Sequence, residues 1–220
     1  VQITQILAQE IKDSRGNPTI KVTISVGGAS GSFSVPSGAS TGKHEAHELR
    51  DPDGKGVENA IKKVNTIIAP ALLGQDISNQ KEIDRIMIEL DGAPNKDNLG
   101  GNAMIGVSVA CAKAAAQATG REVYEYLQAL AEIKPSRKIP YLFMNLIEGG
   151  KHTDNGLAFQ EYHVVPEVAD AEEALQMGIQ IQNTLKKIIG KDLGEESIVL
   201  GDEGGLAPKI TDIRKPLVYL

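Results

Sequence analysis

The stretch Ser197-Ile198-Val199-Leu200-Gly201-Asp202-Glu203-Gly204-Gly205 joins an apolar run to two carboxylates held between glycines. Residues 197–200 predict a buried strand. Glycine lets the backbone bend sharply and lets a ligand or a second backbone approach closely. Residues 201–205 therefore form either an Asp-Glu-Gly surface turn, which is the commoner use of these residue types, or a strand end that directs a catalytic carboxylate into a pocket.

Length and composition limit the classes of protein to consider. The chain has 220 residues, with ordinary apolar and charged fractions, and has room for one large or two modest domains. Its net charge of −6 and the lack of a Lys/Arg cluster argue against general nucleic-acid binding. An anionic small substrate stays open, because a bound metal supplies positive charge that this sum omits. No apolar run approaches the roughly 20 residues of a membrane span.

Cys111 is the one cysteine, and it lies among alanines in a helical pattern. A disulfide within the chain is excluded, which fits a reducing cytoplasm. We expect Cys111 to be a small buried apolar residue rather than a nucleophile. Because the sequence begins at Val1, we expect an initiator methionine or a longer leader to have been removed or left out.

The first part of the chain predicts a three-stranded sheet followed by helices. Residues 20–26 alternate apolar and polar side chains, residues 32–35 predict a hairpin partner, and residues 3–11 predict a third strand. Residues 13–18 are a dense turn signal. The predicted helices cover residues 57–68, 83–90, 102–119 and 123–131. The first stops at Pro70, and the second has Ser78 as N-cap. The third is apolar on nearly every side and is closed by Gly120. We assign residues 1–134 to an α+β domain.

Residues 133–138 are polar and basic, contain a proline, and predict a linker. After this linker, strands alternate with a helix, which indicates the start of a parallel α/β unit of the TIM-barrel kind. Its predicted elements are strands at 139–147 and 157–165, a helix with a capping box of Asp170 and Glu173 that ends at Gly190, and the strand at 197–200.

We assign residues 139–220 to this second domain. Residues 214–220 end the chain on an apolar run, just where a new helix is developing. A natural end at this point would leave apolar groups and sheet edges uncovered. We therefore expect the barrel to be incomplete in this chain.

Residues 35–42 are rich in small, hydroxyl-bearing and glycine residues. They predict either a flexible surface loop or a lid that closes over a ligand. In a lid, Ser40 could offer its hydroxyl and carbonyl oxygens to a hard cation such as Mg²⁺. The spaced glycines and the lysine of a nucleotide-binding P-loop are missing.

Two further stretches carry candidate chemistry. His152 ends the loop Gly149-Gly150-Lys151-His152; a lone histidine is usually structural, but one at a strand end could contact an anionic substrate or move protons. Glu161 lies within an apolar stretch, where a buried carboxylate requires a partner, a metal or a proton, and a structural ion pair is the alternative. Strand alternation directs Gln160 and Glu161 to opposite faces, which favours Glu161.

Taken together, Glu161 and Glu203 follow successive predicted strands and are accompanied by the His152 loop and the hydroxyl loop at 35–42. Convergent polar groups at strand ends are how α/β barrels build active sites. This setting makes Glu203 a catalytic candidate beside the surface-turn alternative, with Asp202 as support or structure.

The motifs resemble those of the enolase family in identity, order and spacing. They are Asp13 to Thr19, Ser37 to Gly42, Asn95 to Asn102, Gly150-Lys151-His152, Gln160-Glu161 and Gly201 to Pro208. The resemblance runs from about residue 3 to about residue 208 and implies an α+β cap domain followed by an α/β barrel. It also implies the hydro-lyase reaction that interconverts 2-phosphoglycerate with phosphoenolpyruvate and water, two Mg²⁺ ions, a cytoplasmic location, and assembly as a homodimer or larger.

Carried over to this sequence, the resemblance implies that Glu203 protonates the departing hydroxyl and that Glu161 is its partner. His152 and Gln160 would contact the substrate, and Ser40 would bind the second Mg²⁺ when the lid closes. Thr153-Asp154-Asn155 departs from the small residues usual in the family, and Asp154 places negative charge near the expected phosphate.

The family's lysine base, its three carboxylate ligands for the tightly bound Mg²⁺ and its phosphate-binding Arg-Ser pair have no counterpart in residues 1–220. We therefore expect this chain alone to be inactive. The alternative is a truncated, non-catalytic relative with a binding or structural role. Another dehydratase or isomerase of the superfamily is less favoured, because the loop at 37–42 is characteristic of enolase itself.

Overall fold

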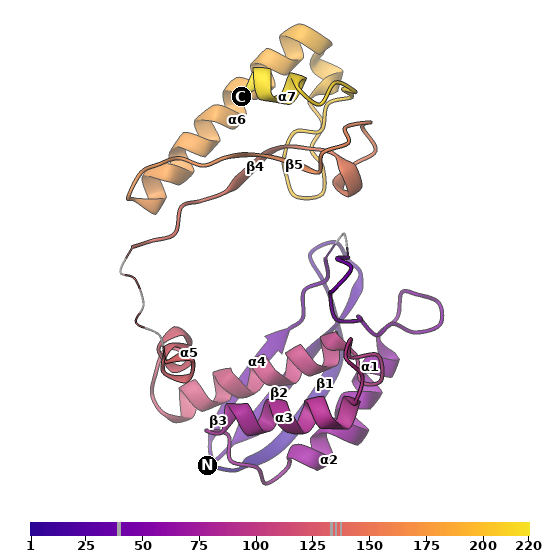
Figure 1. Cartoon of the computed structure of the whole chain (residues 1–220), viewed down its shortest axis with the longest axis vertical. Coiled ribbons are helices and arrows are strands. Elements are labelled where there is room, and N and C mark those ends of the chain that lie inside the picture. Colours follow the sequence, from indigo (N-terminus) through magenta and orange to yellow (C-terminus); the bar gives the residue numbers. More distant parts are fainter. Residues whose placement is uncertain (39–40, 133, 135, 137) are drawn as a thin grey trace. The chain divides into compact units, whose positions relative to one another are not determined.

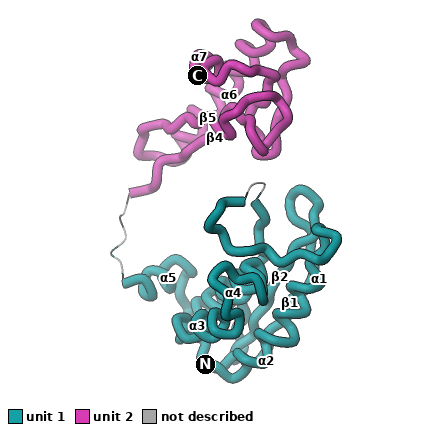
Figure 2. The backbone as a smooth tube through the Cα atoms, turned by 45° about the vertical axis from the view of Figure 1, so that its right-hand side comes forward, with its two compact units in different colours: residues 1–135 teal, residues 136–220 magenta. Residues whose placement is uncertain are grey.

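The computed structural model describes residues 1–38, 41–132, 134, 136 and 138–220. The chain divides into two compact units, unit 1 at residues 1–135 and unit 2 at residues 136–220 (Figure 2). Each unit has a hydrophobic core of its own. Among the described residues, no helix has both the length and the apolar character needed to cross a membrane.

Unit 1 begins with an antiparallel sheet in the order β1-β2-β3, which confirms the predicted three-stranded sheet. Its strands are β1 (Ile3–Lys12), β2 (Pro18–Val26) and β3 (Ala29–Ser34). The predicted turn at 13–18 is confirmed, because Asp13 Oδ1 accepts hydrogen bonds from the backbone N–H groups of Arg15 and Asn17.

The predicted helical region of unit 1 is confirmed, with corrections at its ends. The elements are α1 (Glu58–Lys63), a π-helix (Val64–Ile68), α2 (Ala69–Leu72), α3 (Gln80–Asp91), α4 (Gly101–Ala118) and α5 (Val123–Ala131). Pro70 does not stop the first helix: it lies in the first turn of α2, where a proline needs no N–H partner. The N-cap of α3 is Asn79, which accepts from the N–H of Glu82, and not Ser78.

Helix α4 is the centre of the unit 1 core and packs against β2 and β3 (Figure 1). Its small side chains permit a very close approach. A Cβ atom added at Gly31 in β3 would overlap the backbone nitrogen of Ala114 and the backbone oxygen of Ala110. The backbones of β3 and α4 are therefore in direct contact at this crossing, and only glycine fits at position 31.

Unit 2 contains β4 (Met144–Glu148) and β5 (Glu161–Val164), both shorter than predicted. The predicted parallel arrangement is wrong for this pair, because β4 and β5 are antiparallel. No helix separates them, so the chain reverses direction through the loop at 149–160, which contains the 3₁₀ turn Gly150–His152. A parallel bridge joins Ile147 to Leu206.

The long helix α6 (Ala171–Leu193) begins at the predicted N-cap, where Asp170 accepts from the N–H of Glu173. It does not end at Gly190, which is buried within the helix; Gly194 is the C-cap. Two short helices complete the unit, the 3₁₀ turn Glu195–Ser197 and α7 (Lys215–Tyr219). The described residues form the start of a barrel and no closed one.

The predicted buried strand at 197–200 is wrong. Only Leu200 forms a bridge, to Leu206, and the Val199 and Leu200 side chains are 50% and 54% exposed. A strand becomes buried when neighbouring strands or helices cover it, and in the described part of unit 2 only the turn back to Leu206 pairs with this segment. The predicted linker at 133–138 lies partly outside the described residues.

We predict that Gly31→Ala destabilises unit 1 by about 3 kcal/mol, because the added methyl group must separate β3 from α4. Urea unfolding followed by NMR signals of unit 1 measures this. The matched control is Gly42→Ala, since a Cβ there meets only Glu45 Oε2 at 3.8 Å and should change stability by less than about 0.5 kcal/mol. Equal stabilities of the two variants would contradict the described packing.

Candidate active site

The loop at 201–205 lies at the end of β4. Glu148 donates its N–H to the carbonyl of Leu206, and Leu206 donates to the carbonyl of Leu146, both at 2.9 Å. Gly201 donates to Gly205 at 3.0 Å and so closes the loop. This ladder places the side chain of Glu203 beside the last residue of β4 and beside the loop that follows it.

His152 is the residue around which the site is arranged. It ends the 3₁₀ turn after β4 and is 4% exposed. Its Nδ1 lies 3.4 Å from Glu148 Oε2, and its Nε2 lies 3.6 Å from Glu203 Oε1 and 4.0 Å from Glu161 Oε1. Asp202 donates its N–H to the carbonyl of His152 at 3.4 Å. Three carboxyl groups thus face one imidazole.

Glu161 and Glu203, both predicted from the sequence, lie on the more open side of this cluster. Glu161 was expected to be buried, but its side chain is 32% exposed, because it begins β5 rather than lying within it, and its Oε2 lies 2.7 Å from His163 Nε2. The Glu203 side chain is 48% exposed, and its Oε2 accepts from Asn145 Nδ2 at 3.2 Å.

Gln160 lies just before β5, where its carbonyl accepts from the N–H of Gly149 at 3.0 Å. No described hydrogen bond connects its side chain to the His152 cluster. The expected lid residue, Ser40, lies outside the described residues. The start of that loop is held at Ser37, whose hydroxyl donates to Glu48 at 2.7 Å and accepts from Arg50 at 2.8 Å.

Sequence reasoning missed Glu148, the most buried ionisable group of the cluster. Its side chain is 0% exposed, and neither carboxyl oxygen has a hydrogen-bond partner of normal geometry among the described residues. Burial raises the pKa of this carboxyl, and the nearby Glu203 adds to the rise, while His152 and the backbone N–H groups of Glu203 and Gly205 oppose it. The available signal was a carboxylate that ends the apolar run 146–147 directly before two glycines.

The surrounding backbone closes over Glu148. A Cβ atom at Gly201 would overlap Glu148 Oε1, and a Cβ atom at Gly205 would lie 3.3 Å from it. Asn155, one of the residues that depart from the family pattern, is buried and has a structural role. Its Nδ2 donates to the Glu148 carbonyl at 2.8 Å, and its Oδ1 accepts from the N–H of Leu157 at 3.1 Å.

The described residues do not provide a normal Mg²⁺ site. Glu148, His152 and Glu203 could hold a metal, since one ligand atom of each lies within 4.8 Å of the others. However, Mg²⁺ prefers six oxygen ligands in octahedral geometry, whereas this group offers an imidazole nitrogen and two carboxylates. These three residues are therefore a poor match to Mg²⁺.

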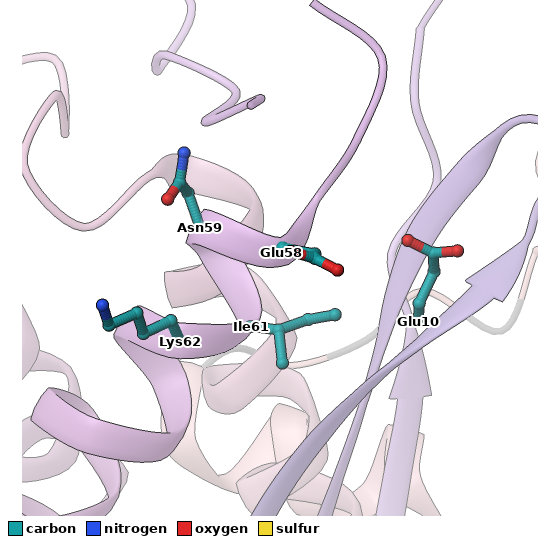
Figure 3. A pocket seen from close by; sticks show the side chains of 5 residues that line it. All are labelled: Glu10, Glu58, Asn59, Ile61 and Lys62. Carbon is teal, nitrogen blue, oxygen red and sulfur yellow. The ribbon is translucent and has the colours of Figure 1, made fainter. Parts of the chain in front are cut away.

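Other features of the described chain carry less chemistry. A cavity of about 610 Å³ in unit 1 is lined by the exposed side chains of Glu10, Glu58, Asn59 and Lys62 and by the half-buried Ile61 (Figure 3). Cys111 is fully buried in α4, and burial raises the pKa of its thiol to about 12. It holds almost no thiolate near neutral pH, as expected for a structural cysteine.

A three-stranded α+β domain, followed by the start of an α/β barrel with acidic groups and a histidine near its strand ends, defines the class of fold. The family model described as "Enolase, N-terminal domain" matches residues 3–127, and the one described as "Enolase, C-terminal TIM barrel domain" matches residues 136–219. The chain belongs to the enolase family, a family of hydro-lyases.

Curated relatives support the same assignment. The chain is 45% identical to the enolase of Thermococcus gammatolerans, over 100% of this chain and 51% of that protein. It is 48% identical to the enolase of Methanococcus aeolicus, over 99% of this chain and 52% of that protein, and 48% identical to that of Methanosarcina barkeri, over 98% and 51%. The chain thus spans about half the length of the curated relatives it matches.

We predict that Glu148→Gln removes a pH-dependent loss of stability. Because the folded-state pKa of Glu148 lies above its ordinary value of 4.5, the folded chain binds more protons than the unfolded chain between these two pKa values. Stability of the parent chain therefore falls as pH rises through that window, and the variant gains relative to it. Urea unfolding of unit 2 at a series of pH values measures the difference.

The matched control is Glu167→Gln, which alters an exposed carboxylate. Its difference from the parent chain should stay nearly constant over the same pH range. A Glu148→Gln difference that is equally flat would show that the carboxyl is not desolvated.

Proposed function

We propose that this chain supplies the cap domain and the first barrel strands of an enolase that converts 2-phospho-D-glycerate reversibly to phosphoenolpyruvate and water, in glycolysis and gluconeogenesis. The observation that supports this most is the convergence of Glu161 and Glu203 on His152, at 4.0 and 3.6 Å, in a chain of the enolase family. The domain ranges 1–134 and 139–220 belong to the same proposal.

In this proposal Glu203 is the general acid. Loss of hydroxide from carbon requires a proton donor, and a carboxyl group within reach of the leaving oxygen can act as that donor. Glu203 reaches solvent, so a substrate can approach it, and Asn145 holds its second oxygen at 3.2 Å. Glu161 is the partner carboxyl, with its Oε1 4.0 Å from His152 Nε2.

His152 and Gln160 are proposed to contact the anionic substrate, and Ser40 to bind a metal in the closed lid. In the family, Mg²⁺ supplies positive charge that stabilises the dianionic intermediate. Apart from this contact of Ser40, the proposal for residues 1–220 concerns proton delivery by Glu203 and Glu161 and substrate contact by His152 and Gln160. A cytoplasmic location and assembly as a homodimer or a larger homo-oligomer are further parts of the proposal.

We propose that the enzyme at the length of its relatives turns over 2-phosphoglycerate, and that residues 1–220 alone do not. The family's base and its main metal ligands are required for abstraction of the weakly acidic proton beside the substrate carboxylate, and these groups have no counterpart here. Turnover of 2-phosphoglycerate by the purified 220-residue chain would contradict this division.

We predict that Glu203→Gln in the full-length enzyme lowers kcat by about 10²- to 10⁴-fold, because the amide cannot deliver a proton to the leaving hydroxyl. Phosphoenolpyruvate formation, followed by its ultraviolet absorbance, measures this. Glu167→Gln, an exposed change outside the site, should keep the parent rate. A Glu203→Gln enzyme with parent activity would remove Glu203 from the role of general acid.

A further inference from the structure

We infer that Glu148 is a positioning residue for His152: the two side chains share one proton between Glu148 Oε2 and Nδ1, which keeps a proton on Nε2 in the gap between Glu161 and Glu203. The inference deepens the proposed function and rests on it for its catalytic consequence. The proton arrangement itself can be measured independently of activity.

The first observation is that two neighbouring buried groups each lack a hydrogen-bond partner. Both oxygens of Glu148 and the Nδ1 atom of His152 are buried without a hydrogen-bond partner of normal geometry among the described residues. Oε2 and Nδ1 lie 3.4 Å apart, within reach of a hydrogen bond after a small adjustment. A buried carboxyl group without a partner is costly, and a proton shared with the imidazole satisfies both groups together.

The second observation is that the atoms packed around the Glu148 carboxyl group restrict its movement. The backbone at Gly201 lies directly against Oε1, and Gly205 lies close by. Asn155 fixes the main chain of Glu148 through its carbonyl. The carboxyl group is therefore held where it is, with His152 Nδ1 3.4 Å from Oε2 and the backbone N–H groups of Glu203 and Gly205 nearby.

The third observation is the surroundings of Nε2. Glu203 and Glu161 face it with carboxyl oxygens at 3.6 and 4.0 Å, and His163 faces Glu161 from within β5. Carboxyl oxygens accept hydrogen bonds, so this side of the ring favours a proton on Nε2. When Nδ1 shares its proton with Glu148, the imidazole presents a fixed N–H donor toward an anionic oxygen placed between the two acids.

A single metal ion explains the geometry less well. One ion binds one nitrogen of an imidazole, but here Glu148 is nearest to Nδ1 and Glu203 is nearest to Nε2. The distribution of carboxyl groups over both nitrogens favours a proton on each side. Zinc ion, which accepts imidazole and carboxylate ligands, is the probe that separates the two explanations.

The test uses the metal-free 220-residue chain with ¹⁵N-labelled histidine. Long-range ¹H–¹⁵N spectra at neutral pH should show Nε2 of His152 as protonated and Nδ1 at a shift between the protonated and unprotonated limits. His152→Asn assigns the signals. Glu148→Gln should move Nδ1 to one limit, since an amide does not exchange a proton, whereas Glu167→Gln should leave it unchanged. An unchanged Nδ1 shift in Glu148→Gln would overturn the inference.

A second measurement needs no variant that must fold. In the parent chain at neutral pH, the side-chain carboxyl ¹³C shift of Glu148 should lie between the limits of a protonated and an ionised carboxyl group, as for a proton shared with Nδ1. A shift at either limit would overturn the inference. Stoichiometric binding of zinc ion at His152 that Glu148→Gln abolishes would also overturn it, in favour of a metal site.

The catalytic consequence is measured in the full-length enzyme. Glu148→Gln should lower kcat/KM for 2-phosphoglycerate by about 10-fold or more, the usual range for a group that orients a functional histidine through its other nitrogen. Parent activity in this variant would count against the positioning role. A parent enzyme without activity on 2-phosphoglycerate would instead refute the proposed function, while the NMR result would still decide how the proton is held.

Discussion

The contact between the buried Glu148 carboxyl and His152 is the constraint on which the site depends. Desolvation makes a free carboxylate unfavourable at that position, so the group requires a proton or a positively charged neighbour. His152 is within 3.4 Å and meets this need from one ring nitrogen. The other nitrogen then faces Glu161 and Glu203. The burial of Glu148, which folding imposes, thereby fixes the orientation of the imidazole toward the two acids.

The backbone of unit 2 makes this contact by bringing three segments together. The antiparallel pair β4–β5 places Glu148 and Glu161 opposite each other, and the parallel bridge from β4 to Leu206 brings the loop at 201–205 alongside. Gly201 has no side chain, which is what allows the loop to close on the Glu148 carboxyl. A larger residue there would displace either the loop or the carboxyl group.

The sequence predicted the elements whose signals are local. Alternation gave the unit 1 strands, and the residues at 123–131 form α5 with the expected bounds. Signals that depend on distant partners were less informative: the apolar run at 197–200 predicted a buried strand that neighbouring elements do not cover. Glu148 was missed for the same reason, because a carboxylate at a strand end is exposed or buried according to a loop 50 residues away. Motif order, in contrast, identified the family.

Glu148 holds His152 in place beside the two acids of the site. The decisive measurement is a crystal structure of the full-length enzyme, determined with and without 2-phosphoglycerate. We expect a Glu148 side chain closed off from solvent, its carboxyl within hydrogen-bond distance of Nδ1, and Nε2 directed between Glu161 and Glu203 in both states. A Glu148 side chain turned to solvent, or a different partner at Nδ1, would refute this role of Glu148.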